Sequence, residues 1–335
     1  MSTAVLVTRP GVHELVTLRP VGPGPDEALV RVHSNGLCGS DADVLSGARP
    51  DGYVRYPLTP GHEWSGVVER VGAGVSGGLV GRKVVGEGVR GCEVCERCRT
   101  GENTLCLSGY EETGFTRPGG MAQNLVVPAR SLYVLPDEAD LAAAALLEPA
   151  ACAMAAVLAA RARPDESVAV LGDGVPGLLV AQLLAASGAR GVTVAGSGGG
   201  GREELALAQG AAGYVAPGEA LPSRCDVVIH TAGAPRTAAR PAGLLGSGGR
   251  LVCTNPALDP LDPREIVKRQ LTVHSVSGAP SRAWALAVGA FVSGRITPGR
   301  LITHTFTLEA YGRAVELLKA DDPAVGKVLL RPTGA

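Results

Sequence analysis

The chain has 335 residues, and its 31 basic and 32 acidic side chains leave a formal net charge of -1. A domain typically takes ~150 residues, so this length favours two domains. The apolar share of 45% is enough for two sizeable cores and excludes wholesale disorder. The balanced charge argues against a dedicated nucleic-acid-binding protein, which usually carries a basic excess.

No export signal or membrane segment is predicted. The first residues carry no basic region of the kind that begins a signal peptide. Glu148-Pro149 interrupts the longest apolar stretch, residues 141–160, whereas a transmembrane helix needs ~20 uninterrupted apolar residues. We therefore expect a cytoplasmic protein without a membrane partner, in which clustered cysteines are more often metal ligands than disulfides.

The N-terminal part of the chain is predicted to be β-rich, because short alternating runs are separated by proline and glycine turns. The expected strands are residues 4–8, 14–18, 27–34, 66–71, 83–86 and 122–127. Near residue 140 the composition becomes helical, and Pro149 suits the first turn of a new helix.

From Ser167 onward, short apolar strands alternate with helices, which predicts a parallel, doubly wound sheet. The expected strands are residues 167–171, 191–195, 225–230 and 250–254, with helices at 177–187 and 202–209. A last strand is expected at 327–331. The predicted layout is an α/β chain with a β-rich domain, residues 1–149 and 279–335, split around a nucleotide-binding domain, residues 150–278.

Four cysteines with the spacing C-x2-C-x2-C-x7-C form the clearest motif, and they are Cys92, Cys95, Cys98 and Cys106. Four thiolates can surround one ion tetrahedrally, and sulfur ligands favour zinc or an iron–sulfur cluster. The ferredoxin spacing is absent, which favours zinc, and a closed shell of four sulfurs indicates a structural site. We expect a metal-bound lobe over about residues 91–107; four unrelated thiols are the alternative.

A second donor set is scattered along the chain. Cys38 follows a predicted strand, His62-Glu63 precedes one, and Glu148 stands where the second domain begins. One thiol, one imidazole and one or two carboxylates form the mixed shell expected of a catalytic zinc, which keeps a position open for water or substrate. Singly, each residue has a plainer explanation: a buried thiol, a structural histidine and a helix-capping carboxylate.

A glycine turn, Gly172-Asp173-Gly174-Val175-Pro176-Gly177, directly follows one predicted strand and opens a helix. The glycines allow a tight turn and close approach of a pyrophosphate, while the helix N-terminus supplies oriented N–H groups. The motif therefore predicts a dinucleotide site that uses Gly172, Gly174, Val175, Pro176 and Gly177.

The end of the next strand bears on the choice between NAD and NADP. An NAD-selective site usually has an acid there, and this chain has Gly196. The missing carboxylate, together with Ser197 and Arg202, favours NADP over NAD, because a 2′-phosphate would meet a hydroxyl and a guanidinium. A merely flexible glycine loop is the alternative.

Together these motifs resemble the zinc-dependent medium-chain dehydrogenase/reductase superfamily, the alcohol dehydrogenase-like oxidoreductases, over essentially the whole chain. Besides the lobe and the glycine turn, the matching pieces are Cys38-Gly39-Ser40-Asp41, Gly61-His62-Glu63, Glu148-Pro149 and Gly326-Lys327-Val328. The resemblance implies a GroES-like catalytic domain, a Rossmann domain, two zinc ions per chain, NADP or NAD, and a homodimer or homotetramer. A glutamate at position 148, where classical alcohol dehydrogenases have a cysteine, resembles the polyol and threonine dehydrogenase branches of the superfamily.

The resemblance also implies the chemistry, which is reversible oxidation of a secondary alcohol to a ketone. Cys38, His62 and Glu148 are the expected ligands of the catalytic zinc, and Glu63 is either a fourth ligand or a carboxylate behind the ligands. Ser40 is expected to take the proton, with Asp43 at the position where family members often carry a proton-relaying histidine.

The substrate is expected to be a small polar alcohol or its ketone, of cyclitol, sugar or aminosugar type. Two segments, residues 62–66 and 112–116, are similar to bacterial aminocyclitol dehydrogenases. The resemblance also places four acids near the mouth of the site: Asp41, Asp43, Glu111 and Glu112. Such acids suit a polyhydroxylated or amine-bearing substrate. The alternatives are a threonine or simple secondary-alcohol dehydrogenase, a zinc-free reductase of the same fold, and a non-catalytic nucleotide-binding protein.

Overall fold

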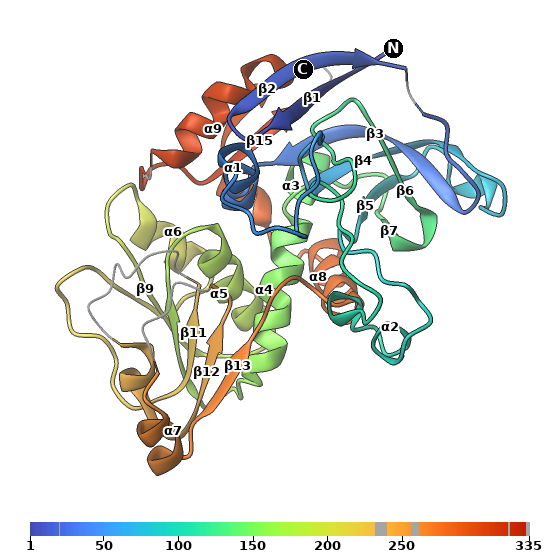
Figure 1. The fold of residues 1–335 in the computed structure, drawn as a ribbon. Helices are drawn as coiled ribbons and strands as arrows, with labels where there is room; N and C mark the ends of the chain where they lie inside the picture. Colours follow the sequence, from blue (N-terminus) through green and yellow to red (C-terminus); the bar gives the residue numbers. More distant parts are fainter. Residues whose placement is uncertain (20, 232–239, 256–260, 321, 333–335) are drawn as a thin grey trace. The chain divides into compact units, whose positions relative to one another are not determined.

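The computed structural model describes the chain except residues 20, 232–239, 256–260, 321 and 333–335. The chain forms two compact units. Unit 1 comprises Met1–Glu148, Pro280–Val292 and Thr297–Ala335, and unit 2 comprises Pro149–Ala279 and Ser293–Ile296. Unit 1 therefore contains both ends of the described chain, with unit 2 inserted into its sequence (Figure 1).

Unit 1 is built on a seven-stranded sheet of order β14-β15-β3-β4-β5-β7, in which β6 also pairs with β3. Its strands are β3 (Glu27–Gly36), β4 (Glu63–Val71), β5 (Lys83–Gly86), β6 (Asn124–Pro128), β7 (Leu132–Val134), β14 (Ile302–Thr307) and β15 (Lys327–Arg331). A separate antiparallel pair joins β1 (Ser2–Arg9) to β2 (Val12–Leu18). The sheet brings β15, at the end of the chain, next to β3.

Apolar side chains on one face of β3 form the core under this sheet. Val30 and Val32 are fully buried, whereas Arg31 between them is exposed, which is the alternation of a half-buried strand. They pack with Trp64, Val68, Val84, Leu125 and Val127 from the neighbouring strands.

Unit 1 also contains five α-helices of four to twelve residues in its described part. They are α1 (Gly39–Ser46), α2 (Glu96–Arg99), α3 (Leu141–Ala144), α8 (Ser281–Val292) and α9 (Tyr311–Lys319). In Figure 1, α9 and α1 lie beside the β1–β2 pair. A second core joins these elements through Val5, Leu37, Ala42, Leu308, Tyr311 and Val328. The strand before Cys38 and the C-terminal segment are thereby packed into one body.

Unit 2 is a six-stranded parallel sheet of order β10-β9-β8-β11-β12-β13. Its strands are β8 (Ser167–Leu171), β9 (Gly191–Ala195), β10 (Gly213–Val215), β11 (Cys225–His230), β12 (Leu245–Cys253) and β13 (Thr272–Ser275). The helices that alternate with them are α4 (Leu147–Ala160), α5 (Val175–Ala186), α6 (Arg202–Ala208) and α7 (Pro263–Arg269). The strand order reverses between β8 and β11, as in doubly wound sheets, and this confirms the predicted fold class.

Several element boundaries differ from the expected ones; β4, for example, begins at Glu63 rather than Gly66. Two of these differences have a local reason. Helix α5 begins at Val175 rather than Gly177, because Pro176 fits the first turn, where its missing N–H costs no hydrogen bond. Strand β12 begins at Leu245 rather than Arg250. Its glycine-rich start resembles a turn in sequence, but Leu245 pairs with Cys225 across an irregular register.

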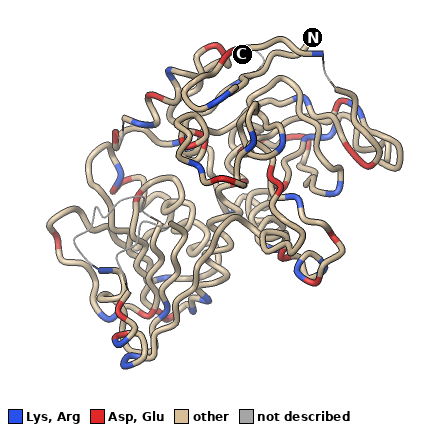
Figure 2. Tube along the Cα trace, in the orientation of Figure 1, with Lys and Arg blue, Asp and Glu red and all other residues tan. Residues whose placement is uncertain are grey.

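Charged side chains of both signs are spread along the chain. In Figure 2, Lys and Arg are interspersed with Asp and Glu on the trace. Across the described residues, no helix combines the length and apolar character needed to cross a membrane.

Candidate active site and metal centres

The first candidate ligand, Cys38, lies at the turn between β3 and α1. Its backbone N–H donates to the Asp41 carboxylate at 2.9 Å, so a residue in the first turn of α1 fixes the turn that presents the thiol. Cys38 is half-buried, whereas Asp41 is completely buried. The local sequence thus holds the thiol at the edge of the core.

His62 and Glu63 come to the same place from the start of β4. Both side chains are buried, and Glu63 pairs with Gly36 across the sheet. A Cβ atom on Gly36 would lie 2.1 Å from a Glu63 oxygen, so glycine is needed there to admit the carboxylate. One donor atom each from Cys38, His62 and Glu63 lies within 4.8 Å of the others.

The Asp41 carboxylate is the nearest charged neighbour of His62, with its Oδ1 atom 3.6 Å from Nδ1. Burial disfavours the charged imidazolium, but Asp41, together with Cys38 and Glu148, outweighs burial and raises the pKa of His62. The Phe115 ring lies 4.7 Å from the imidazole ring, centroid to centroid. The imidazole therefore has both a carboxylate and an aromatic ring as neighbours.

Lys327 is the ion-pair partner of Glu63, a role that its position in the sequence does not reveal. Its ammonium donates to both Glu63 oxygens at 2.7 Å and to the Leu37 carbonyl at 2.9 Å. Burial opposes the charge on Lys327, but Glu63, together with Cys38 and Glu148, outweighs burial and raises the pKa of the lysine. A buried ion pair thus connects β15 to the residue next to His62.

Glu148 is the second residue of α4 and is half-buried. Its charge acts on the pKa values of His62 and Lys327, so it belongs to the same electrostatic environment. Among the described residues, the group of donors that meet within 4.8 Å contains Cys38, His62 and Glu63 but not Glu148. The structure therefore brings three of the four expected residues together and places the fourth nearby.

Ser40 and Asp43 lie one turn apart on α1. Ser40 is half-buried beside the Cys38 turn, and Asp43 is exposed. The helix therefore connects the neighbourhood of the thiol to solvent over a single turn.

The four acids expected at the mouth of the site differ in their surroundings. Asp41 is not a rim residue, because its side chain has no exposed surface and serves Cys38 and His62. Asp43 is exposed, and Glu111 forms hydrogen bonds with both nitrogens of the Arg117 fork. Glu112 is mostly buried, and burial raises its pKa to about 7.

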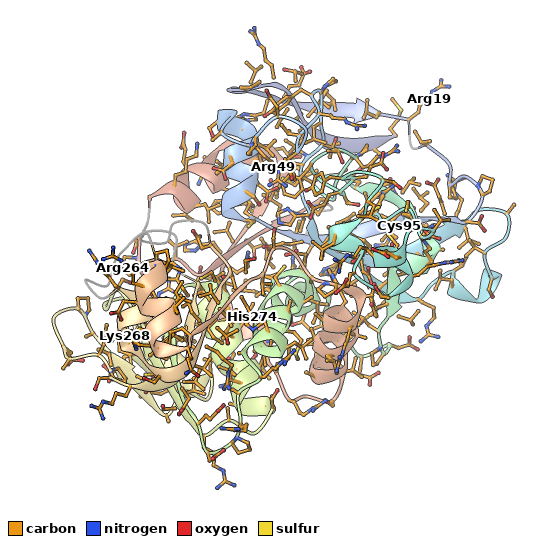
Figure 3. All side chains as sticks on the ribbon, turned by 60° about the horizontal axis from the view of Figure 1, so that its bottom comes forward. Arg19, Arg49, Cys95, Arg264, Lys268 and His274 are labelled. Carbon is orange, nitrogen blue, oxygen red and sulfur yellow. The ribbon has the colours of Figure 1, made fainter. Side chains whose placement is uncertain are left out.

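Glu112 belongs to a polar cluster that sequence reasoning identified only in part. Tyr110 donates a short hydrogen bond to Glu112, and Arg49 donates to Tyr110 at 2.8 Å and approaches Glu112 at 3.5 Å. The Arg49 guanidinium, labelled in Figure 3, lies 3.5 Å over the ring of Phe115, which itself contacts His62. Arg49 thus contacts Phe115, and Phe115 in turn contacts His62, a candidate metal ligand.

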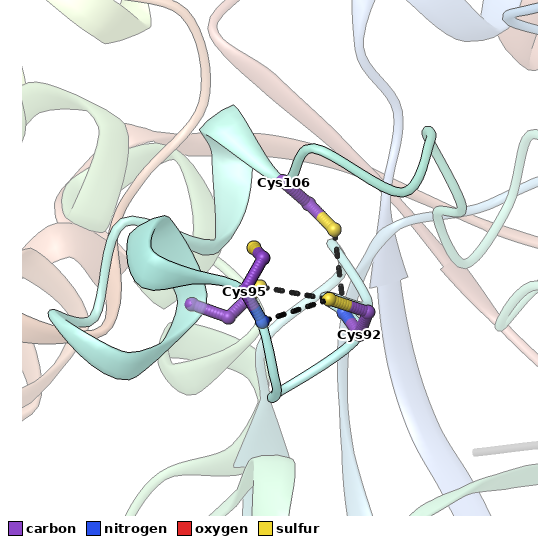
Figure 4. Close-up of side chains that lie close together, drawn as sticks. Cys92, Cys95 and Cys106 are labelled. Carbon is purple, nitrogen blue, oxygen red and sulfur yellow. Dashed lines mark hydrogen bonds between the residues drawn. The ribbon is translucent and has the colours of Figure 1, made fainter.

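The four cysteines of the lobe also converge, with their sulfur atoms within 4.8 Å of one another (Figure 4). The Cys92 N–H points at the Cys106 sulfur at 3.3 Å, and the Cys95 N–H at the Cys92 sulfur at 3.4 Å. Hydrogen bonds from Ser108 and then from backbone N–H groups lower the pKa of Cys92 to about 6. These hydrogen bonds favour the thiolate form of Cys92, which is the form that binds metal, whereas burial raises the pKa of the Cys98 thiol to about 12.

A carboxylate anchors this lobe to the rest of unit 1. Glu87 accepts hydrogen bonds from Asn103 at 2.7 Å, Tyr133 at 2.8 Å and Ser281 at 3.0 Å. Asn103 stands between the third and fourth cysteines, and Ser281 begins α8. Three segments distant in sequence therefore meet at one side chain.

In unit 2, the predicted cofactor residues occupy two neighbouring strand ends. The motif from Gly172 to Gly177 joins β8 to α5, and a Cβ atom on Gly177 would lie 1.9 Å from the Gly172 carbonyl oxygen. Gly196 and Ser197 follow β9, and Arg202 begins α6. Parallel neighbours β8 and β9 place both ends at the carboxyl edge of the sheet, where such folds bind nucleotides.

The chain is similar to several groups of known proteins. An alcohol dehydrogenase GroES-like domain matches residues 24–137. Galactitol 1-phosphate 5-dehydrogenase of Escherichia coli K12 is 30% identical over 329 residues, covering 92% of this chain and 93% of the relative. The chain belongs to the zinc-dependent medium-chain dehydrogenase/reductase superfamily.

Further members show the same extent of similarity. Sorbitol dehydrogenase of Halalkalibacterium halodurans and L-threonine 3-dehydrogenase of Legionella pneumophila (strain Corby) are each 28% identical, with 92% of this chain and 93% of each relative covered.

Two solved structures align over 99% of both chains. One is a cobalt- and zinc-bound thermostable alcohol dehydrogenase of Pyrobaculum aerophilum, with a TM-score of 0.89 and 31% identity. The other is a putative zinc-binding dehydrogenase of Sinorhizobium meliloti bound to NADP, with a TM-score of 0.88 and 29% identity. The chain is thus an NAD(P)-dependent, zinc-type oxidoreductase of the alcohol dehydrogenase kind.

Proposed function

We propose that this enzyme interconverts a secondary alcohol of cyclitol, sugar or aminosugar type and its ketone, with the hydride passing between the carbinol carbon and the nicotinamide of NAD(P). The observation that carries the reaction type is the convergence of Cys38, His62 and Glu63, with Asp41 and Lys327 behind them. Relatives named as galactitol 1-phosphate and sorbitol dehydrogenases support a polyhydroxylated substrate.

Cys38, His62 and Glu148 hold the catalytic zinc in this proposal. One thiol, one imidazole and one carboxylate are a suitable donor set for zinc at a catalytic site. The bound zinc supplies positive charge that lowers the pKa of the substrate hydroxyl. Lys327 already donates to both Glu63 oxygens, which favours Glu63 as the carboxylate behind the ligands.

Asp41 and Lys327 act as positioning residues. The Asp41 carboxylate holds both the turn before Cys38 and the face of His62 that carries Nδ1. Such partners of metal-binding histidines fix the ring orientation and raise its basicity. Lys327 fixes Glu63 in the same way and balances its charge in the buried interior.

Ser40 accepts the hydroxyl proton, and Asp43 passes it to solvent. This assignment is supported by the half-buried position of Ser40 and the exposure of Asp43 one turn later on α1. A carboxylate at position 43 replaces the relaying histidine that many family members carry. The proton therefore leaves along the face of a single helix.

This chain's own residues also support a hydroxyl-rich substrate, through the polar cluster of Arg49, Tyr110 and Glu112. Its charged and hydroxyl groups lie next to Phe115, whose ring contacts His62. A substrate with several hydroxyls or an amine can form hydrogen bonds with such groups, whereas a short aliphatic alcohol leaves them unused.

A substrate screen tests this function. Purified enzyme is assayed with NAD and NADP against inositols, deoxyaminocyclitols, aminoglycoside fragments, sorbitol, threonine and 2-butanol, following the absorbance of the reduced cofactor. We expect the largest kcat/KM with a cyclic or linear polyol or an aminocyclitol. Much faster turnover of 2-butanol or threonine contradicts the substrate class and leaves the reaction type intact.

The remaining parts of the proposal are the structural zinc, the oligomer and the location. Cys92, Cys95, Cys98 and Cys106 hold a second zinc, supported by their meeting within 4.8 Å. We also propose a homodimer or homotetramer located in the cytoplasm; membership of the family supports the assembly. Light scattering after size-exclusion chromatography checks the assembly, and metal analysis of the purified protein should give two zinc ions per chain.

A further inference from the structure

The adenosine end of the dinucleotide site lacks the acid that usually follows the second strand. Strand β9 ends at Ala195, and the next residue is Gly196. In Rossmann folds a carboxylate at this point accepts hydrogen bonds from the ribose hydroxyls and disfavours a 2′-phosphate. The sequence alone therefore favoured NADP.

The structure places a different carboxylate at this point. A Cβ atom built on Gly196 would lie 2.2 Å from both Cγ and Oδ2 of Asp173, the residue between the first two glycines of the turn. The Asp173 side chain therefore occupies the space that a side chain at position 196 would enter. Asp173 is only 7% exposed, so this position is part of a packed arrangement.

Neighbouring groups hold the Asp173 carboxylate in place. Its Oδ2 atom accepts hydrogen bonds from the Ser197 N–H at 2.9 Å and the Tyr214 hydroxyl at 2.8 Å. Its Oδ1 atom has a 3.3 Å contact from the Ser197 hydroxyl, which also lies 3.2 Å from Oδ2. A carboxylate has about four acceptor positions, so Oδ1 keeps capacity for a ligand hydroxyl.

The two residues that favoured a 2′-phosphate are directed toward Asp173. Both the backbone and the hydroxyl of Ser197 donate to its carboxylate. The Arg202 guanidinium donates to the Asp173 carbonyl at 3.1 Å, and Arg202 is only 7% exposed. Arg202 thus braces the glycine turn from the start of α6.

We propose that Asp173 selects NAD(H) over NADP(H), with its carboxylate accepting from the adenosine ribose and repelling a 2′-phosphate in place of the acid missing at position 196. This inference rests on the dinucleotide site of the proposed function but not on the identity of the alcohol. The selecting charge comes from the variable position of the glycine motif, and Gly196 is glycine because a side chain there would displace it.

Direct binding of NADH and NADPH tests the proposal without any alcohol substrate. The full-length protein is titrated with each reduced cofactor, and nicotinamide fluorescence gives the two Kd values. We expect NADH to bind at least about tenfold more tightly than NADPH, which corresponds to a modest discrimination of ~1.4 kcal/mol. Tighter binding of NADPH by the unaltered protein overturns the proposal.

Three variants separate the charge from the local structure. Asp173→Asn should reduce the NADH preference about tenfold, mainly by tightening NADPH binding, because it removes the charge and keeps the shape. Tyr214→Phe removes one hydrogen bond to the carboxylate but no charge, so the preference should remain. The double variant Asp173→Ala with Gly196→Asp moves the acid to the end of β9 and should restore the preference for NADH.

The outcomes also separate this inference from the proposed function. An unchanged NADH to NADPH ratio in Asp173→Asn, with circular dichroism and Tm showing a folded protein, overturns the role of Asp173. A chain that binds neither cofactor contradicts both proposals. A chain that binds NADH with the expected preference but oxidises no polyol leaves Asp173 as the selecting residue and removes only the substrate class.

Discussion

The two candidate metal centres of unit 1 are built in opposite ways. The lobe takes four sulfur atoms from residues at most 14 positions apart, and those thiols are half-buried and oriented by nearby backbone N–H groups. The centre at Cys38 takes unlike atoms from separate segments, is more deeply buried, and depends on Asp41 and Lys327 behind it.

This difference shows how each centre is suited to its role. Four thiolates satisfy zinc completely and leave no position for substrate, so the lobe can only stabilise. A mixed set with a carboxylate leaves a position open, but its geometry must come from the surrounding fold. We therefore expect mutations at the two centres to separate catalysis from stability.

The largest effect should come from His62→Ala. Loss of one ligand removes the metal contribution to the transition state, and several kcal/mol correspond to roughly a thousandfold or more in kcat/KM. Metal analysis should then give one zinc per chain, with the lobe still loaded and Tm nearly unchanged. Near-normal turnover by this variant would remove the zinc mechanism.

Asp41→Asn should have the next largest effect, because it weakens the support of His62 without removing a ligand. Loss of such a partner typically weakens metal binding by ~10–100-fold. The measurement is the chelator concentration that removes half of the catalytic zinc. Asp43→Asn, on the exposed side of the same helix, is the matched control and should leave zinc retention unchanged; an equal loss in both variants would contradict the role of Asp41.

Cys95→Ser in the lobe should have the opposite effect, lowering the stability of the protein while leaving its activity. Structural zinc contributes ~10 kcal/mol or more in small sites, and a fraction of that lowers Tm by roughly 5 °C or more in a large domain. Turnover per folded molecule should persist at low temperature. Differential scanning calorimetry with zinc analysis checks this, and an unchanged Tm after loss of one zinc would show that the lobe is not a stabilising element.

The smallest expected effect is on the way stability changes with pH, and it comes from Glu112 in the polar cluster. Burial raises the pKa of Glu112 from 4.5 to about 7. Between these values the folded protein holds a proton that the unfolded chain releases, so Glu112 makes the protein less stable as pH rises. Glu112→Gln should flatten this slope in urea unfolding measured at pH 5, 6, 7 and 8. Parallel curves for the two proteins would argue against a buried, protonated Glu112.

The sequence predicted the features that are local along the chain. The ends of β8, β9, β11 and β15 follow from apolar runs bounded by glycine or polar residues. The four cysteines are recognisable by spacing alone. The predicted start of strand β12, Arg250, is too late, because Gly246, Gly248 and Gly249 resemble a turn in sequence, whereas Leu245 before them already pairs with Cys225 of β11.

The supporting residues could not be predicted, because their roles arise from long-range contacts. Asp41 looked like a surface acid among several, and only burial beside His62 distinguishes it. Asp173 occupies a variable motif position, and only its proximity to Gly196 gives it a role. The sequence shows that position 196 carries no acid, but it does not show that a carboxylate from the end of another strand, Asp173, occupies the space there.

The bond between Lys327 and Glu63 has a consequence for biosynthesis, because 264 positions separate the two residues. During synthesis, Glu63 emerges long before β15, and all of unit 2 is made in between. The lobe can close over its metal while the ribosome is still elongating the chain, since local contacts form early. The catalytic centre acquires its buried ammonium only after β15 has joined β3. The two metals of one chain should thus be loaded in a fixed order, with the metal of the lobe first.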